Sequence, residues 1–288
     1  MSPTLLGALL MTASMAAFTL NDTMLKLTAG DVPLAQLIFL RSFLTCTLML
    51  ATKGRIGTMH FDIARRDWVL IGARAVSEVV VSYFFLTALF HMPLANLNAV
   101  MQVVPLAVTL ASALFLREAV GWRRFAAIII GFFGVLLIVK PGAAGFDIWS
   151  AYALLAMIGV TARDLITRQL SPTVPSMTVA LSTAASVMTA FGLVSLTGAW
   201  VAVPSHIWFL IVGSAVAVMA GYFLSIWVMR VGDVSFTAPF RYTGLVWALI
   251  MGWFVFGEWP GWLTLLGAGI VVVTGVFTFY RERKVSRG

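Results

Sequence analysis

Eight charged side chains lie inside apolar segments of this sequence, where each can bind a ligand, carry a proton or pair with another charge. They are Asp22, Lys26, Arg41, Arg74, Glu78, Arg163, Asp164 and Arg241. An unpaired charge at the centre of a bilayer costs at least about 2.5 kcal/mol, so each is expected to face a partner or a polar cavity. Five are basic and three are acidic, and this positive excess favours a ligand with an anionic or strongly accepting group.

Two arginines are candidates for contact with that ligand. Arg41 stands about nine residues into an apolar run, close to mid-membrane, where its side chain cannot easily reach the surface. Arg241 lies about two turns into another run, roughly 10 Å below one end at about 1.5 Å per residue. Guanidinium groups suit carboxylate, phosphate or ring-carbonyl acceptors. Gly244, Ala248 and Gly252 recur every four residues in the second run, which predicts close approach by another helix.

Glu78 is near the centre of its run and lies four residues after Arg74, on the same helix face. Burial disfavours the charged form of a carboxylate, so Glu78 is a candidate proton carrier unless an arginine keeps it ionised. Arg74 and Arg41 are both candidates for that arginine. A coupling carboxylate and a purely structural Arg-Glu-Arg network therefore stay open as alternatives.

Asp22 and Lys26 are also four residues apart and can satisfy each other as an ion pair, either structural or with a gating or proton-sensitive role. Asp22 and Asp164 lie near opposite ends of their runs, roughly 20 Å apart along the membrane normal. That separation is too large for an aspartyl protease pair that shares one proton. The sequence also has no H-E-x-x-H signature and no cysteine and histidine cluster. We therefore predict no enzyme, no metal site and no cofactor.

The elements that carry these residues must cross a membrane. Of the 288 residues, 61% are hydrophobic and 10% are charged, against about 25% charged in ordinary soluble domains, and the mean hydropathy is +0.99. Apolar runs bounded by Gly, Pro or charge predict an all-α integral membrane fold of ten helices, with no room for a separate soluble domain. The helices are expected at 3–26, 32–52, 67–90, 94–116, 121–139, 147–170, 174–198, 205–230, 234–256 and 261–280.

The basic residues gather on one side of this predicted bundle. If the N-terminus is inside, that side receives Lys53, Arg55, Arg65, Arg66, Arg117, Arg123, Arg124, Arg168, Arg230, Arg281, Arg283, Lys284 and Arg287. The other side receives little beyond Lys26 and Lys140. The positive-inside rule then predicts a multi-pass protein of the inner membrane with both termini in the cytoplasm. The net charge of +8 is explained by this topology in a lipid bilayer, so no nucleic-acid partner is expected.

The second half of the sequence repeats features of the first at nearly constant spacing. The matched features, at offsets of 139 to 142, are the Val-Pro steps at 32 and 174, Asp22 and Asp164, the YF motifs at Tyr83 and Tyr222, and the Glu-x-x-Gly-Trp motifs at 118 and 258. Each unit holds five helices, an odd number, so the second must enter the membrane from the opposite side. We predict two inverted five-helix repeats, residues 1–141 and 142–288, with a binding site at their interface near mid-bilayer.

The repeat also matches Gln102 to Arg241 at an offset of 139, with Asn98 one turn before Gln102. An amide and a guanidinium facing each other across the interface would both offer donors to a ligand. The predicted ligand contacts are therefore Arg41, Gln102 and Arg241, with Tyr83, Trp227 and Tyr242 as stacking residues for a flat heterocycle. Aromatic side chains in membrane helices more often serve packing or the interfacial belt, and that alternative stays open for each.

Several motifs together resemble one transporter family over essentially the whole chain. They are LNDTMLKL from residue 20, DVPLAQLIFLRS from 31, VVPL from 103, REAVGW from 117, IIGFFGVLLIVKPG from 129 and GEWPGW from 257. They are similar to the EamA family of the drug/metabolite transporter superfamily. RDLITRQL and TAPFRY, with the arginine after the first Val-Pro step, look most like the subgroup of S-adenosylmethionine and riboflavin transporters. The resemblance implies a ten-helix, two-repeat carrier.

The combined expectation is a secondary transporter that moves a small polar organic metabolite across the inner membrane by alternating access. No G-x-x-x-x-G-K-[ST] motif for ATP is present, so a gradient of protons, another ion or the substrate must drive it. Glu78 is the predicted coupling or counter-ion carboxylate, and the further coupling or gating residues are Asp22, Lys26, Arg74 and Asp164. The alternative is an exporter of amino acids or toxic metabolites.

Overall fold

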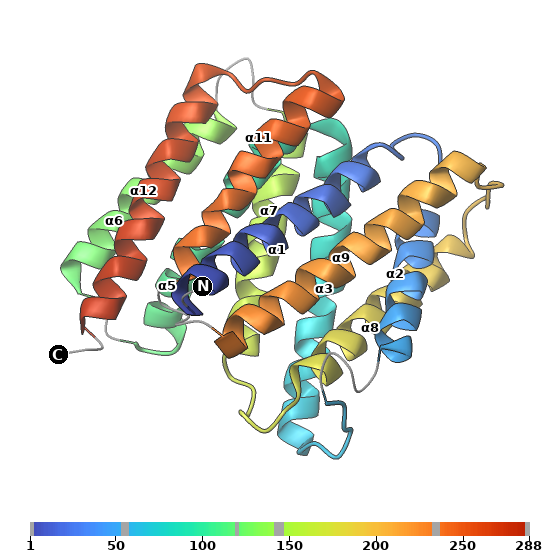
Figure 1. The fold of residues 1–288 in the computed structure, drawn as a ribbon, viewed down its shortest axis with the longest axis horizontal. Coiled ribbons are helices and arrows are strands. Elements are labelled where there is room, and N and C mark those ends of the chain that lie inside the picture. Colours follow the sequence, from blue (N-terminus) through green and yellow to red (C-terminus); the bar gives the residue numbers. More distant parts are fainter. Residues whose placement is uncertain (1–2, 53–57, 119–120, 141–146, 232–236, 286–288) are drawn as a thin grey trace.

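The computed structural model describes residues 3–52, 58–118, 121–140, 147–231 and 237–285, and all secondary structure in these ranges is helical (Figure 1). This confirms the predicted all-α fold. The helices are α1 (Pro3–Lys26), α2 (Leu34–Ala51), α3 (Arg65–His91), α4 (Leu94–Met101), α5 (Val104–Phe115), α6 (Trp122–Val139), α7 (Ile148–Thr167), α8 (Ser176–Ser195), α9 (Ser205–Val231), the 3-10 helix η1 (Ala238–Tyr242), α11 (Thr243–Phe256) and α12 (Trp262–Val285).

Within the described ranges, nine segments are long and apolar enough to cross a membrane, and Trp262–Thr278 is a shorter apolar helix. Each of the ten predicted ranges overlaps one of these segments, and α3 extends past its predicted range, 67–90, at both ends. The chain is therefore a multi-pass membrane protein. The predicted boundary between residues 141 and 142 lies outside the described residues, as do the loop cations Lys53, Arg55 and Arg287.

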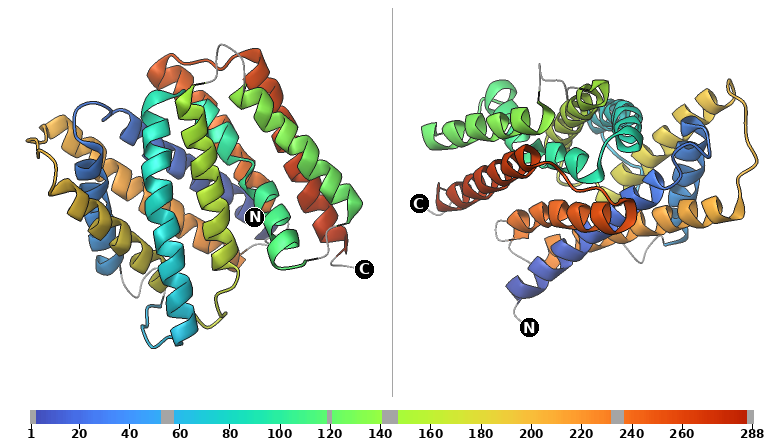
Figure 2. Two further views of the ribbon diagram at one scale, coloured as in Figure 1. Left: turned by 180° about the vertical axis from the view of Figure 1, so that it is seen from behind. Right: turned by 90° about the horizontal axis from the view of Figure 1, so that it is seen from above.

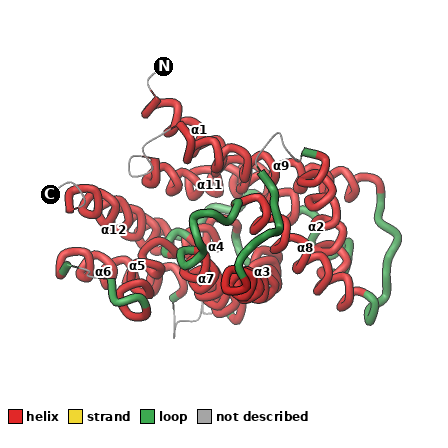
Figure 3. Tube along the Cα trace, turned by 90° about the horizontal axis from the view of Figure 1, so that it is seen from below, coloured by secondary structure: helices red, strands yellow, loops and turns green. Residues whose placement is uncertain are grey.

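The helices pack in pairs that join one predicted half of the chain to the other. α1 runs along α9, α3 along α7, α2 along α8, and α6 along α12 (Figures 1 and 2). By repeat position, α7 is the counterpart of α1 and α3 is the counterpart of α9. Replacing both helices of the α1–α9 pair by their counterparts therefore gives the α3–α7 pair. From below, α6 and α12 lie at one edge of the bundle and α2 and α8 at the opposite edge (Figure 3). This paired packing is what a twofold relation between two halves would produce.

α6 and α12 approach each other at glycine. A Cβ atom added at Gly134 of α6 would lie 2.8 Å from the backbone oxygen of Gly267 in α12, closer than real Cβ contacts. Apolar side chains gain little from leaving lipid, so membrane helices associate through such close backbone packing. The outer faces of the bundle carry exposed apolar side chains, including Phe133 and Phe254, as expected for surfaces in contact with lipid.

Two of the predicted continuous helices are interrupted. The range 94–116 is divided between α4 and α5, with Pro105 in the first turn of α5. The described part of 234–256 begins with η1, which has Pro239 in its first turn, before α11 starts at Thr243. Proline lacks the N–H that a helix interior needs, which favours a break or a tighter turn. The starts of α5 and α11 match at the offset of the repeat, so both interruptions occupy the same position in it.

α5 and α11 also end in matching turns. Arg117 and Gly257, which occupy equivalent positions in the repeat, are both left-handed, with φ of 57° and 65°. The next residue in each turn is a glutamate whose N–H reaches back six residues: Glu118 to Ser112 O at 3.3 Å and Glu258 to Gly252 O at 2.9 Å. Because the two helices run in opposite directions, these turns place the glutamates at opposite ends of the bundle.

The two ends of the bundle are named here by their cations. α1 and α11 finish at the upper end in Figure 1, called the Lys26 end. α5 and α7 finish at the lower end, called the Arg168 end because Arg168 directly follows α7.

Candidate functional site

A polar cavity lies between α2, α3, α8 and α9, with an empty volume of about 530 Å³ that includes solvent at its open side. Its polar lining residues are Arg41, Ser42, Thr45, Arg74, Glu78, Ser82, Thr183 and Tyr222. The structure therefore brings three of the predicted charged residues, two arginines and a glutamate, to one cavity wall. The serine, threonine and tyrosine hydroxyls add groups that can donate or accept hydrogen bonds.

Arg41 lies about two turns inside α2, which starts directly after Pro33. Proline suits this position because the first helical residues need no intrahelical N–H partner. The Nε atom of Arg41 is buried without a hydrogen-bond partner among the described residues. Asp22, Glu78 and Tyr222 are within electrostatic reach of the guanidinium. A guanidinium that lines a cavity and keeps a buried, unpartnered Nε donor is suited to bind an anionic or accepting group.

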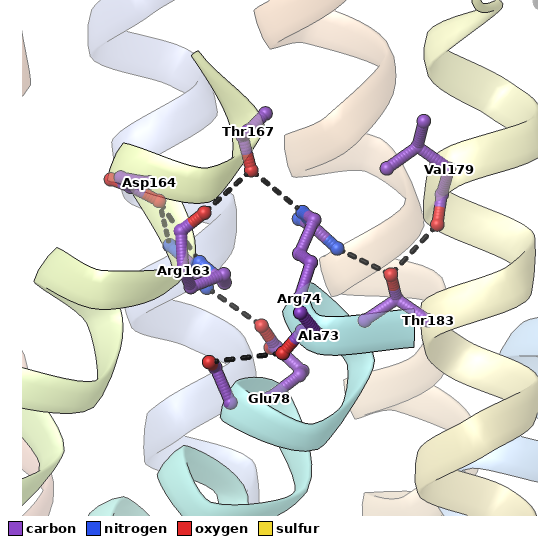
Figure 4. A network of polar contacts seen from close by, with 9 residues as sticks. Ala73, Arg74, Glu78, Arg163, Asp164, Thr167, Val179 and Thr183 are labelled. Carbon is purple, nitrogen blue, oxygen red and sulfur yellow. Dashed lines mark hydrogen bonds and ion pairs between the residues drawn. The ribbon is translucent and has the colours of Figure 1, made fainter. Parts of the chain in front are cut away.

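Glu78 is held by an arginine of another helix. Arg163 of α7 donates from Nη1 to Oε2 of Glu78 at 3.0 Å and from Nε to Oδ1 of Asp164 at 2.9 Å (Figure 4). The predicted partners of Glu78, Arg74 and Arg41, make no direct ion pair with it within the described part of the chain. The prediction is therefore corrected: an Arg-carboxylate network exists, but its central cation is Arg163.

Arg74 instead connects α3 to two neighbouring helices. Its Nε donates to Oγ1 of Thr167 in α7 at 2.9 Å, and its Nη1 donates to Oγ1 of Thr183 in α8 (Figure 4). The hydroxyl of Thr167 in turn donates to the carbonyl of Arg163. The direct hydrogen bonds of Arg74 thus go to neutral hydroxyl oxygens, while the direct ion pair of Glu78 is with Arg163.

Lys26 pairs with Glu258 rather than with Asp22, which corrects the predicted pair on α1. Lys26 Nζ lies 2.7 and 3.0 Å from the two carboxylate oxygens of Glu258 and donates to the carbonyl of Met92 at 2.8 Å. Glu258 also accepts the backbone N–H of Leu94 at 3.1 Å, at the start of α4. The side-chain contact of Asp22 is an accepted hydrogen bond from Asn21 at 2.9 Å. Lys26 therefore ties α1 to the ends of α3 and α11.

Gln102 and Arg241 are neighbours, as their repeat positions suggested. Gln102 Nε2 donates to the backbone oxygen of Arg241 at 3.5 Å, and a Cβ at Gly244 would lie 3.3 Å from the same Nε2. Arg241 stands in η1 rather than two turns into an α-helix, and its side chain is exposed. Neither residue lines the cavity around Arg41. Tyr242 is buried, and its ring packs against Gly275 of α12.

The aromatic side chain that lines the cavity is Tyr222, which the sequence did not single out as a binding residue. Its repeat counterpart Tyr83 is 43% exposed and contacts Phe84 and Tyr152 edge-on or tilted. Trp227 is 42% exposed and packs on Phe223. The repeat match between Tyr83 and Tyr222 was the available signal, but it did not show which of the two faces the cavity.

The profile of the EamA-like transporter family matches residues 5–140 and 147–280. The S-adenosylmethionine uptake transporter of Rickettsia bellii is 24% identical over 94% of this chain and 92% of its own. The riboflavin transporter of Vibrio cholerae is 30% identical over 69% of this chain and 66% of its own, so the match spans just under two thirds of that protein. The pseudopaline exporter of Pseudomonas aeruginosa is 24% identical over 96% of this chain and 97% of its own.

A solved crystal structure shares the fold, with a TM-score of 0.63 and 17% identity over 97% of this chain and 98% of the other. At that identity the likeness concerns the arrangement of the helices alone.

Proposed function

Because the chain belongs to the EamA-like transporter family, we propose that it moves a small polar organic metabolite, S-adenosylmethionine-like or riboflavin-like, across the inner membrane by alternating access. Residues 1–141 and 142–288 form the two inverted repeats, with the binding site at their interface. Both termini lie in the cytoplasm, and a gradient of protons, another ion or the substrate supplies the energy.

The observation that carries this proposal is Arg41. It lines the cavity with a buried Nε atom that has no hydrogen-bond partner among the described residues, and the nearby carboxylate of Glu78 is already paired with Arg163. The carboxylate of an S-adenosylmethionine-like molecule or the dione of a flavin-like one supplies the missing acceptor. Tyr222 offers a ring beside the same space. Gln102 and Arg241 do not line this cavity, so a contact of theirs with the substrate would belong to another stage of the cycle.

Ligand-dependent thermal stability and flux test the proposal. The purified protein is heated with S-adenosylmethionine, riboflavin, aromatic amino acids, nucleosides and dicarboxylates, and uptake of any stabilising compound is measured in proteoliposomes. A ligand at 100 times its dissociation constant stabilises the fold by about 2.7 kcal/mol. Loss of a charged hydrogen bond in Arg41→Met should weaken binding about tenfold or more.

The matched control is Arg123→Met, at the exposed start of α6 and outside the cavity lining. It removes the same charge and should leave ligand binding unchanged. Equal binding by the wild type and the Arg41 variant for every active compound would overturn the assignment of Arg41. Absence of flux for the whole panel would count against the transporter proposal itself.

Export is the second candidate, favoured by the similarity to the pseudopaline exporter across nearly the full chain. The same cavity serves both directions, since alternating access is reversible and the gradient sets the direction. Flux measured in both directions, with and without a pH step, distinguishes the two. Net efflux of amino acids or toxic metabolites would place the exporter first.

A further inference from the structure

Two ion pairs in this chain occupy equivalent positions in its two halves. Arg168 matches Lys26 at an offset of 142, and Glu258 matches Glu118 at an offset of 140. Lys26 pairs with Glu258, and Arg168 pairs with Glu118. Each pair joins a cation at the end of the first helix of one half to a glutamate just after the fourth span of the other half. The two pairs lie at opposite ends of the bundle, because their helices run in opposite directions.

The backbone around the two glutamates is the same, so the ion pairs can be compared directly. Each glutamate follows a residue with left-handed backbone conformation, and its backbone N–H donates to the carbonyl oxygen six residues earlier. The two ion pairs nevertheless differ in the distance between their charged atoms and in their exposure to solvent. Lys26 contacts both oxygens of Glu258, the shorter at 2.7 Å, with the two side chains 9% and 28% exposed. Arg168 reaches one oxygen of Glu118 at 3.4 Å, with side chains 45% and 53% exposed.

The cavity has the same asymmetry. Along α2 its lining residues run from Arg41 to Met49, towards the Arg168 end. Along α8 they run from Ala180 to Val187, mostly in the first half of the helix. α2 runs towards the Arg168 end and α8 starts from it, so the cavity spans the half of the bundle nearest that end. The tight ion pair lies at the opposite end from the cavity.

We propose that Lys26–Glu258 and Arg168–Glu118 are a pair of alternating gates, each closed when the other is loose. In this structure the Lys26 end is closed and the cavity extends towards the Arg168 end. In the opposite state Arg168 and Glu118 close and become buried, while Lys26 and Glu258 separate. The inference rests on the alternating-access mechanism of the proposed function, and it adds the residues that hold each state.

Thiol accessibility tests the gates without any substrate. The single cysteine is removed by Cys46→Ser, and Ala184→Cys places one thiol in the cavity wall. A membrane-impermeant maleimide is applied to right-side-out and to inverted vesicles, and the labelling rate from each side is measured. Lys26→Gln should raise labelling from the Lys26 end about tenfold, because it leaves a largely buried glutamate unpaired in the closed state. Glu118→Gln should lower labelling from the Lys26 end. The Arg168–Glu118 pair stabilises the state in which the Lys26 end is open, and this substitution weakens that pair.

The two variants are expected to change the labelling rate in opposite directions, which distinguishes gates from ordinary structural ion pairs. If both variants changed labelling in the same direction, or neither changed it, the proposal would be overturned. The exchanged double variant Lys26→Glu/Glu258→Lys restores the ion pair but not the bonds to Met92 and Leu94, so it should bring the ratio part of the way back to that of the wild type. This partial return guards against a single variant that misfolds. Because labelling needs no substrate, unchanged ratios in a protein that transports would reject the gates alone. If the ratio of labelling rates from the two sides shifted as expected in a protein that transports none of the tested compounds, the gates would be supported and the substrate proposal would fail.

Discussion

At the scale of single residues, the polar network is organised around Arg163. The sequence identified Glu78 as the membrane carboxylate that needs a counter-charge, and this need is met. The arginine that meets it could not be identified from spacing, because Arg163 lies 85 residues away and reaches Glu78 only through the packing of α7 on α3. Spacing of four residues shows which groups share a helix face but not whether a neighbouring helix offers a better partner.

Removal of that cation should destabilise the protein strongly. Arg163→Leu leaves Glu78 without its ion-pair partner at a site where both side chains are about four-fifths covered. A buried charge that loses its partner typically costs about 3 kcal/mol or more, so the melting temperature in detergent should fall clearly. The double variant Glu78→Leu/Arg163→Leu should recover part of the loss. A double variant less stable than Arg163→Leu alone would contradict the central place of this pair.

At the scale of helices, most of the fold could be predicted because proline, glycine and charge interrupt the apolar runs at the membrane surfaces. α1 and α6 differ from their predicted ranges by at most one residue at either end. The breaks after Met101 and Tyr242 were missed, because an apolar run with a single proline is compatible with a continuous helix, a kink or a break. Which of these forms depends on the neighbouring helices, and that information is not local.

The contact between α6 and α12 gives a test at this scale. Gly134→Ala places a methyl group 2.8 Å from the backbone oxygen of Gly267, which cannot move aside as a side chain could. Forced shifts of this kind cost about 1–3 kcal/mol, so we expect a lower melting temperature.

The matched control is Gly269→Ala on α12, where an added Cβ meets nothing within 4 Å. It should leave stability unchanged or raise it slightly, since alanine favours the helix over glycine by up to about 1 kcal/mol. If both substitutions had the same effect, the close approach of these two helices would not contribute to stability.

At the scale of the whole molecule, composition predicted a membrane protein and the offsets of 139 to 142 predicted paired halves. The sequence could not show which end of the bundle is closed. Both states are built from the same residues, and the difference in free energy between them depends on many small packing and ion-pair changes. Only the structure, with one tight and one loose ion pair, distinguishes the two ends.

The proposed orientation of the bundle in the membrane rests on the distribution of basic residues and can be measured directly. Green fluorescent protein fused to the C-terminus should fluoresce and alkaline phosphatase fused there should be inactive, because the positive-inside rule predicts a cytoplasmic C-terminus. Alkaline phosphatase inserted between residues 142 and 143 should be active. The reverse pattern at both positions would invert the orientation and with it the side that each gate faces.

Glu258 has two partners, Lys26 and the backbone N–H of Leu94. If the Lys26 contact breaks when that end opens, the bond to Leu94 can persist and keep the end of α11 fastened to the first turn of α4. α11 packs on α4 as well, although the two belong to different repeats. The parts that move as rigid bodies would then differ from the parts that were duplicated in the sequence. α4 and α11, one helix from each repeat, would move together relative to α1.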